Sequence, residues 1–329
     1  MSNIRDVAKL AGVSTATVSR VLNNITTYKI TAATKAGVLD AAMQLGYSIE
    51  KKPTHAPLKV GCVLCVTKNK YTDSYFTSIL SGIEEQLKAE GLSLAFLKTL
   101  DELTDEYELY NTFTKELSSV ILMETLNDET YAFIKSNVRH LVGIDIERDD
   151  IDNIGYDHFK AAAQITTYLI KQGHTKIAFV SGSGEGGDVK KTRRYAGFAA
   201  TMAQHGLAVN PAWIADCQWN DTLCIEQVKQ MAALPDRPSA IFAGSDFMAM
   251  AALSALYSIN VNVPSQMAVM GLSDIELSKY SNPPLSTVHI PAKEIGMLAV
   301  KTILERMRGD TSPPKHILLQ SALVIRDST

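Results

Sequence analysis

The chain has 329 residues, enough for two or three domains, and no continuous apolar run long enough to cross a bilayer. Its net charge of −3 does not by itself suggest a nucleic-acid-binding protein, but the charge is unevenly divided. Residues 1–59 hold eight Lys and Arg against three Asp and Glu, whereas residues 60–329 hold 24 against 32. A basic segment joined to a larger acidic one is typical of a phosphate-contacting domain attached to one that does not touch DNA.

Two short amphipathic helices are predicted within residues 3–23. Apolar side chains recur at three- and four-residue steps in both: Ile4, Val7, Ala8 and Ala11 in the first, and Val18, Val21 and Leu22 in the second. Gly12 stands where the chain must turn, because a left-handed backbone costs glycine little. Ser14 can cap the second helix. The pattern predicts a helix-turn-helix, which places its second helix in the major groove of DNA.

The polar face of the second helix supplies the candidate DNA contacts, which are Ser14, Thr15, Ala16, Thr17, Ser19, Arg20 and Asn23. The first residues of such a helix face base edges, so Thr15 and Ala16 are expected to read bases, Ala16 against a thymine methyl. Arg20 and Asn23 suit a base edge or a phosphate, and the small hydroxyl side chains suit phosphates. The alternative is a solvated helix face.

The segment DVAKLAGVSTATVSRVLN resembles the N-terminal signature of the lactose-repressor (LacI/GalR) family of bacterial transcription regulators. The resemblance implies a homodimer that binds a near-palindromic double-stranded DNA operator. The following stretch, NNITTYKIT, is long for the family and resembles the branch of β-galactosidase and galactose-operon repressors. That branch points to a galactoside as effector.

A third helix is predicted over 32–45, ending at Gly46, so the DNA-binding domain is expected to cover 1–46. Residues 47–58 form a polar linker with Pro53 and Pro57, which disfavour a helix. Members of the family usually carry a hinge helix here that enters the minor groove. The sequence departs from the family at this point, and residues 59–329 remain for an effector-binding and dimerisation domain.

From residue 60 onward, short apolar runs alternate with amphipathic segments. The apolar runs, interpreted as strands, cover 60–66, 92–97, 119–123, 140–144, 176–181, 240–243 and 268–272. The amphipathic segments, interpreted as helices, cover 76–90, 104–116, 127–137, 159–172, 191–205, 221–233 and 246–259. Apolar strands alternating with helices indicate parallel sheets covered on both faces. The fold class expected is therefore an all-α helix-turn-helix head on a two-lobed α/β body with two parallel sheets.

The body resembles the same family through GHTKIAFVSG (173–182), RYAGF (194–198), AGSDFMAMAAL (243–253) and NPPLSTV (282–288). The resemblance implies the fold of periplasmic sugar-binding proteins, with the chain crossing between lobes near 156–158, 286–288 and the C-terminus. Lobe 1 is then expected to cover about 59–156 plus 289–314, and lobe 2 about 157–286 plus 315–329.

The resemblance also supplies candidate effector contacts: Arg194, Trp219, Asp246 and Asp274 from lobe 2, and Tyr75, Phe76 and Asp145 from lobe 1. An arginine fork and an acceptor carboxylate can bracket vicinal hydroxyls of a sugar. An indole offers a flat apolar surface to a pyranose ring. The alternative for a single Arg or Asp is a surface charge or a helix cap.

Two other patterns are weaker. Gly182, Gly184 and Gly187 form the pattern GxGxxG after a strand, as in a dinucleotide-binding site. No acidic residue closes a second strand about 20 positions later, so a loop at the edge of the cleft is favoured instead.

Cys62 and Cys65 have CxxC spacing within an apolar run, so buried reduced thiols are expected, with Cys217 and Cys224 also unpaired. The sequence contains no recognisable catalytic set, metal site or cofactor motif.

We therefore expect a cytoplasmic, homodimeric, ligand-responsive DNA-binding regulator, a repressor of sugar-utilisation genes released by a sugar and not an enzyme. The resemblance does not extend to a tetramerising helix, so a dimer is expected. A regulator with a non-sugar co-repressor is the main alternative. Two further alternatives are weaker. A solute-binding protein would need a secretion signal, but the predicted helix-turn-helix occupies that position. An NAD(P)-dependent enzyme would depend on the glycine-rich loop alone.

Overall fold

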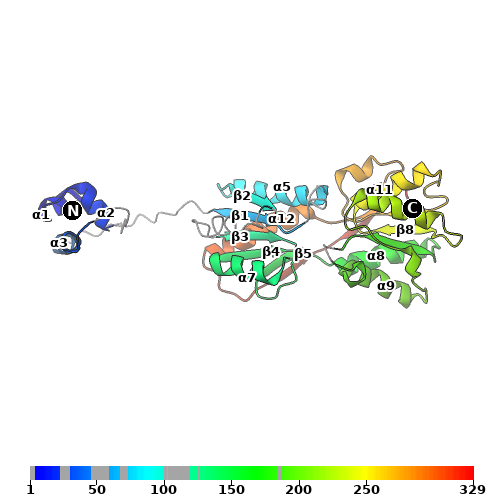
Figure 1. Cartoon of the computed structure of the whole chain (residues 1–329), viewed down its shortest axis with the longest axis horizontal. Coiled ribbons are helices and arrows are strands. Elements are labelled where there is room, and N and C mark those ends of the chain that lie inside the picture. The colour runs from blue at the N-terminus through cyan, green and yellow to red at the C-terminus, as the bar shows by residue number, and fades with distance from the viewer. Residues whose placement is uncertain are drawn as a thin grey trace. The chain divides into compact units, whose positions relative to one another are not determined.

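The computed structural model describes residues 4–22, 30–45, 59–66, 73–99, 102, 119–124, 126–183 and 187–329 (Figure 1). The chain divides into two compact units, Met1–Pro57 and Leu58–Thr329. Asn23, the linker 47–58 and the helix expected over 104–116 lie outside the described residues. Within the described ranges, no helix is long and apolar enough to cross a membrane.

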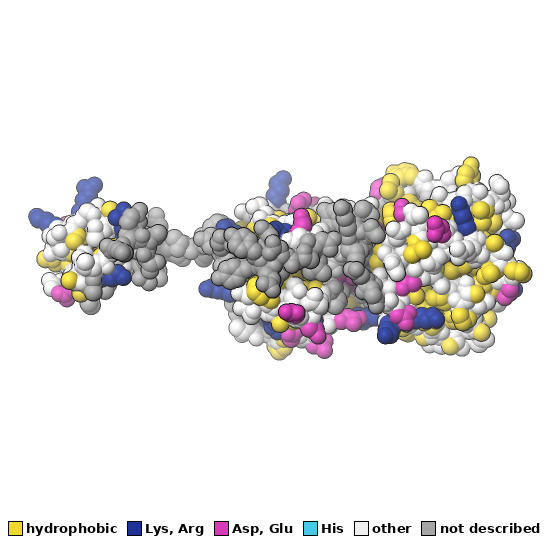
Figure 2. Space-filling model, in the orientation of Figure 1, with side chains coloured by type: hydrophobic (Ala, Val, Ile, Leu, Met, Phe, Trp, Pro, Cys, Tyr) yellow, Lys and Arg dark blue, Asp and Glu magenta, His cyan; other side chains and the backbone are white. Residues whose placement is uncertain are grey.

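The first unit, which we call the head, contains α1 (Ile4–Leu10), α2 (Thr15–Leu22) and α3 (Ala32–Gln44). One fully buried valine from each helix (Val7, Val18 and Val38) forms the centre of its small core. Gly12 adopts a φ of 65° between α1 and α2. The Ser14 hydroxyl accepts a hydrogen bond from the Thr17 backbone N–H at 3.1 Å. The predicted helix-turn-helix is confirmed. Lys and Arg side chains lie on the surface of the head (Figure 2).

The second unit, which we call the body, begins with a six-stranded parallel sheet in the order β11-β5-β4-β3-β1-β2. Its strands are β1 (Val60–Leu64), β2 (Leu94–Thr99), β3 (Ser119–Met123), β4 (His140–Ile144), β5 (Asp152–Tyr156) and β11 (His316–Leu319). The helices of this lobe are α5 (Ser74–Ala89), α7 (Asp128–Asn137) and α12 (Ala292–Met307). The central strands β1, β3 and β4 are almost wholly buried, which explains their continuous apolar sequences.

The second lobe holds a four-stranded parallel sheet in the order β7-β6-β8-β9. Its strands are β6 (Ile177–Ser181), β7 (Ile214–Asp216), β8 (Ala240–Ala243) and β9 (Ala268–Met270). Its helices are α8 (His158–Lys171), α9 (Arg193–Gln204), α10 (Asp221–Ala232) and α11 (Asp246–Ser258). Helices α8 and α9 pack together on one face of the sheet, and α10 and α11 on the other (Figure 1). The expected fold class, a helical head and a two-lobed α/β body with two parallel sheets, is confirmed.

Glycines allow two helix pairs to approach closely. A Cβ added at Gly82 in α5 would overlap the Lys293 carbonyl oxygen of α12, and one at Gly296 in α12 would overlap the Ile79 carbonyl oxygen of α5. In the second lobe, a Cβ at Gly197 in α9 would overlap the Phe159 carbonyl oxygen of α8. Backbone-to-backbone contact of this kind is open only to glycine.

The last segment that crosses between the lobes shows that one expected lobe boundary, at residue 315, was wrong. Residues 315–329 were expected to belong entirely to lobe 2, but β11 pairs with β5 and is an edge strand of the first-lobe sheet. The return occurs only at β12 (Ala322–Val324), which pairs antiparallel with β10 (Thr287–His289). The expected boundary was wrong because β11 has only four residues, with alternate ones exposed, and its sequence does not reveal its partner.

All four cysteines are buried and unpaired, as expected. Burial raises the pKa of the Cys65 thiol to about 12, with a smaller contribution from Glu124. Burial also raises the pKa of Cys62. A thiol that stays protonated near neutral pH is a poor nucleophile and metal ligand, so the CxxC spacing here is a packing feature.

Candidate functional site: a cleft between the lobes

A small cavity lies between the two lobes of the body, beyond the carboxyl ends of the strands. It is lined by Asp73, Tyr75, Phe76, Glu124, Tyr156, Arg194, Trp219, Gly244, Ser245 and Ser273. These residues come from the start of α5, the ends of β3 and β5, the start of α9 and the segments after β7, β8 and β9. Its volume of about 10 Å³ has room for roughly one water molecule, so a ligand the size of a sugar requires the lobes to separate.

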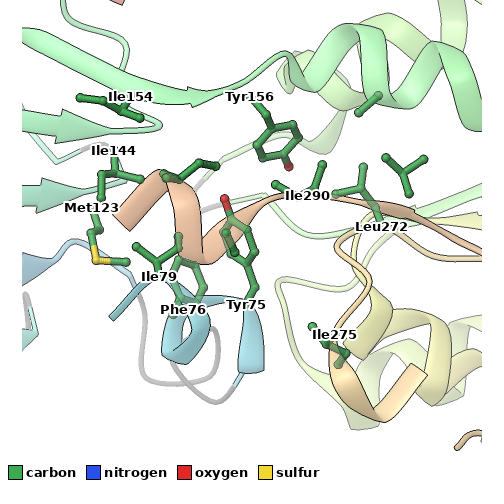
Figure 3. Packing of buried hydrophobic residues seen from close by; sticks show 14 of the residues in the cluster. Tyr75, Phe76, Ile79, Met123, Ile144, Ile154, Tyr156, Leu272, Ile275 and Ile290 are labelled. Atoms are coloured by element: carbon green, nitrogen blue, oxygen red, sulfur yellow. The ribbon is translucent and has the colours of Figure 1, made fainter. Parts of the chain in front are cut away.

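Aromatic rings form much of the first-lobe side of the cleft. Tyr75 projects from α5 and Tyr156 from the end of β5, with ring centroids 6.5 Å apart in an edge-to-face arrangement (Figure 3). His158 stacks on Tyr156 at 4.0 Å. Phe76 is buried beside Tyr75 with ring centroids 5.3 Å apart. These rings give the cleft rigid apolar walls with hydroxyl groups at their tips.

Arg194 is the central polar group on the second-lobe side. Its Nη2 donates a hydrogen bond to the Tyr156 hydroxyl at 2.9 Å, and its guanidinium lies 5.5 Å from the Trp219 ring centroid. Its Nε is buried and has no hydrogen-bond partner within the part of the chain that the structure describes. Burial lowers the pKa of Arg194, but the hydrogen bond to Tyr156 and the nearby Glu124 and Asp145 carboxylates outweigh burial and hold the pKa above the ordinary value. A buried cationic donor without an acceptor is suited to an acceptor oxygen of a ligand.

Trp219 has a left-handed backbone with a φ of 57°. Gly182 makes room for it, because a Cβ at Gly182 would lie 2.5 Å from the Trp219 backbone nitrogen and 2.7 Å from its ring. The first glycine of GxGxxG therefore serves the packing of the cleft, whereas residues 184–186 lie outside the described residues.

Asp145 lies behind the lining. Its carboxylate accepts hydrogen bonds from the Tyr75 hydroxyl at 2.9 Å and lies 3.2 Å from His158 Nε2, and its side chain is 5% exposed. Burial opposes ionisation, but the His158 charge and the hydrogen bonds from His158 and Tyr75 outweigh burial and hold the pKa of Asp145 below its ordinary value. In this closed conformation Asp145 orients Tyr75 and does not line the cavity.

Asp246 and Asp274 also lie outside the lining. Asp246 is fully buried at the start of α11, where it accepts hydrogen bonds from Thr287 Oγ1 at 2.5 Å and from the Ile275 N–H at 2.9 Å. Asp274 accepts a hydrogen bond from Arg326 Nη2 at 2.6 Å and lies 3.1 Å from His289 Nδ1. Both carboxylates bind the crossing segments of the chain.

Of the seven expected effector residues, the structure thus brings Tyr75, Phe76, Arg194 and Trp219 to the cavity. Sequence reasoning missed Asp73, Glu124, Tyr156, Ser245 and Ser273. A usable signal existed for Glu124, since it directly follows the apolar strand β3, at the edge where open α/β sheets bind ligands.

In the head, Ser14, Thr15 and Ala16 are exposed at the start of α2, while Thr17, Ser19 and Arg20 are partly exposed. Ser14 is engaged as the helix cap, and its hydroxyl lies 2.9 Å from that of Thr17. Val18 is buried on the opposite face. The second helix therefore presents a small, polar N-terminal surface of the kind that fits a major groove.

A helix-turn-helix head together with a two-lobed body and an interlobe cleft defines a class, the ligand-responsive DNA-binding transcription regulators. Residues 3–49 match the family of bacterial regulatory proteins of the lacI family, and residues 166–329 match the periplasmic binding protein-like domain. The PurR transcriptional repressor of Actinobacillus pleuropneumoniae is 31% identical over 341 residues, covering all of this chain and 98% of the relative. That of Photobacterium profundum is 29% identical over 333 residues, covering all of this chain and 98% of the relative. The chain belongs to the lacI family and is a DNA-binding transcriptional repressor.

Solved structures have the same fold. The CelR–cellobiose complex superposes with a TM-score of 0.73 at 23% identity, covering all of both chains. The lac repressor dimer bound to operator and the anti-inducer ONPF gives 0.71 at 22% identity, covering 99% of this chain and 98% of the other. A LacI family regulator from Lactobacillus casei with bound sucrose gives 0.68 at 26% identity, covering 82% of this chain and 99% of the other. These relatives and neighbours are transcription regulators and not enzymes.

Proposed function

We propose that this repressor controls sugar-utilisation genes in the cytoplasm and is released from its operator by a sugar bound in the interlobe cleft. The observation that carries the proposal is the cleft itself, in which the Arg194 guanidinium and the Trp219 indole stand opposite tyrosine rings and carboxylates. Aromatic faces suit the C–H faces of a pyranose, and charged donors and acceptors suit its hydroxyls. A sugar, cellobiose or sucrose, is bound in two of the structural neighbours.

The competing ligand is a purine. The PurR relatives are similar over the whole chain, and aromatic walls also suit a flat heterocycle. We favour the sugar because Glu124 and Asp73 add two acceptor groups to the lining, which matches a ligand rich in hydroxyl donors. Galactosides are the first sugars to test, because the long NNITTYKIT stretch after α2 resembles the branch of β-galactosidase and galactose-operon repressors.

The operator is read by α2. Thr15 and Ala16 lie exposed in its first turn and contact base edges, with Arg20 one turn further along. Replacing Arg20 with Ala should abolish specific operator binding in a gel-shift assay and leave effector affinity unchanged, because Arg20 lies in a different compact unit from the cleft. Unchanged operator affinity would refute this assignment. Lys35→Ala, which removes an exposed charge from α3, is the matched control.

Effector binding and DNA binding are coupled, because binding at either site changes the binding free energy at the other. A sugar that holds the lobes in one arrangement changes how the two heads of a dimer match the half-sites of a near-palindromic operator. The crossing segments are joined to the second lobe through the Thr287–Asp246 and Arg326–Asp274 hydrogen bonds.

A second copy of this chain is proposed to cover the apolar surface formed by α11 and the segment after β9. Tyr257 is 81% exposed and lines a groove of about 370 Å³ together with Met250, Leu253 and Ser281. Tyr280, which directly precedes Ser281, is 73% exposed. Exposed tyrosines beside an apolar groove are typical anchors of interfaces. In sedimentation velocity, Tyr280→Asp should dissociate the dimer and Lys171→Asp on α8 should not. A dimer unaffected by Tyr280→Asp would place the interface elsewhere.

The decisive test of the ligand is a thermal-shift screen with matched panels of sugars and purines. A ligand that binds only the folded state raises the melting temperature. We expect stabilisation by at least one neutral sugar and operator release by the same sugar in a gel shift. Stabilisation by hypoxanthine or guanine, with none by any sugar, would refute the sugar proposal in favour of the purine.

A further inference from the structure

A polar pocket of about 250 Å³ lies beside the amino ends of β4 and β5, at the edge of the first-lobe sheet opposite to the cleft. Its walls come from the end of α7, the start of β4, the segment before β5 and the end of α12. Pockets for drug-sized ligands usually measure about 300–1,000 Å³, so this one suits a smaller molecule. We call it the amino-edge pocket. Within the described part of the chain, the ionisable side chains that line it are Lys135, Arg139, His140, Asp150, Asp152 and Arg306.

Four of these six side chains form two ion pairs. Arg306 donates from Nε and Nη2 to the two carboxylate oxygens of Asp152, at 2.6 and 2.8 Å, and its Nη1 donates to the segment after α12. Lys135 pairs with Asp150, which also accepts a hydrogen bond from the Tyr131 hydroxyl at 2.7 Å. Lys135 and Arg306 lie in the last turns of α7 and α12, where a positive charge offsets the negative end of a helix. Both carboxylates of the pocket are therefore already matched by cations.

Arg139 and His140, at the start of β4, are the two ionisable side chains of the pocket that these pairs leave over. Neither side chain forms a hydrogen bond or an ion pair with any residue that the structure describes. Arg139 is exposed and His140 is partly exposed. Burial lowers the pKa of His140, and the charges of Arg139 and Arg306 lower it further, which indicates a positive potential at its ring. The pocket therefore offers a guanidinium and an imidazole N–H to an anion.

We propose that the amino-edge pocket binds the phosphate group of inorganic phosphate or of a small phosphate ester, with Arg139 and His140 as its donors. A guanidinium fork matches two phosphate oxygens, and an imidazole N–H can donate to a third. A carboxylate has only two oxygens, so it serves two separate donors less well. Because the cleft lies beyond the opposite ends of the strands, this phosphate site is separate from the proposed sugar site and does not depend on it.

The test is calorimetric titration of the full-length protein, at constant ionic strength, with inorganic phosphate, glycerol 3-phosphate and acetate. We expect at least one of the two phosphate compounds to bind, and acetate to bind several-fold more weakly. Tighter binding of glycerol 3-phosphate would identify an ester as the ligand, and tighter binding of inorganic phosphate would identify the free ion. Binding of neither phosphate compound, or equally tight binding of acetate, overturns the proposal.

Four variants locate the bound phosphate. Arg139→Gln should weaken phosphate binding about tenfold, since hydrogen bonds between charged groups are the strong ones, and His140→Leu should weaken it several-fold. Arg193→Gln removes an exposed arginine from α9 and should leave the phosphate affinity unchanged, as should Arg194→Ala in the cleft. Phosphate affinity unaltered in both Arg139→Gln and His140→Leu would place the bound ion elsewhere, such as on the basic head, and refute the proposal. A loss of phosphate binding in Arg194→Ala alone would place it in the cleft, with the same consequence.

Discussion

The two lobes of the body are built on the same plan of parallel strands and covering helices, yet they give the cleft side chains of opposite charge. The first lobe contributes Asp73 and Glu124, and the second contributes Arg194 beside Trp219. Position alone does not explain the difference, since Asp73 and Arg194 both stand at the start of a helix and only Glu124 directly follows a strand. Opposite charges therefore meet in one cleft.

The second lobe is joined to a crossing segment through Asp246, and substitution of this residue has the largest expected effect. Burial raises the pKa of Asp246 from 3.8 to about 7, and the hydrogen bonds from Thr287 and Ile275 only partly oppose that shift. The folded protein therefore retains a proton that the unfolded chain releases. The stability contributed by this proton is fully present below about pH 4 and is lost as the pH rises through about 7.

Asp246→Asn should remove this pH dependence. At about 1.4 kcal/mol per pH unit, the wild type should lose up to about 4 kcal/mol relative to the variant between pH 4 and pH 7. Urea unfolding at several pH values measures the difference, and Asp221→Asn on the surface of α10 serves as control. Parallel pH profiles for wild type and Asp246→Asn would show that Asp246 is ionised in the fold.

Helix packing offers a second comparison of the lobes. The α5–α12 pair of lobe 1 has glycines on both helices, Gly82 and Gly296, whereas the α8–α9 pair of lobe 2 relies on Gly197. Gly82→Ala should cost about 3 kcal/mol, because overpacking against a backbone carbonyl forces the helices apart. Thermal unfolding measures the loss. Gly37→Ala in α3, where nothing lies within 4 Å of the added Cβ, should be neutral or stabilise the head by about 0.5–1 kcal/mol. Equal effects of the two substitutions would contradict the close approach.

The charge asymmetry of the cleft predicts a smaller but more specific effect. Arg194→Ala should weaken binding of the sugar found in the thermal-shift screen by about 100-fold, since hydrogen bonds to a charged group contribute about 1.5–3 kcal/mol. Operator affinity without ligand should stay unchanged. Arg193→Ala, the exposed neighbour, is the matched control in calorimetry. If the two variants bind the sugar equally well, Arg194 does not contact it.

Local patterns in the sequence determined much of this protein. The helix-turn-helix, with Gly12 at the turn and Ser14 at the cap, depends on residues within a few positions of one another. The strands β3, β4 and β8 were predicted with the bounds that they have, because fully buried strands have continuous apolar sequences. The resemblance to the family added Arg194 and Trp219, both of which line the cleft.

Only the tertiary structure decided which polar side chains share the cleft and which are buried elsewhere. Glu124 and Arg194, 70 positions apart in the sequence, line the same cavity because it lies between the two lobes. Asp246 meets Thr287 because a crossing segment passes α11. The partner of β11 likewise depends on β5, more than 150 positions away. The periodicity of apolar residues in the sequence predicts which side chains are buried. The charged groups and hydrogen-bond partners that surround a buried side chain come from distant segments, which only the complete fold brings together.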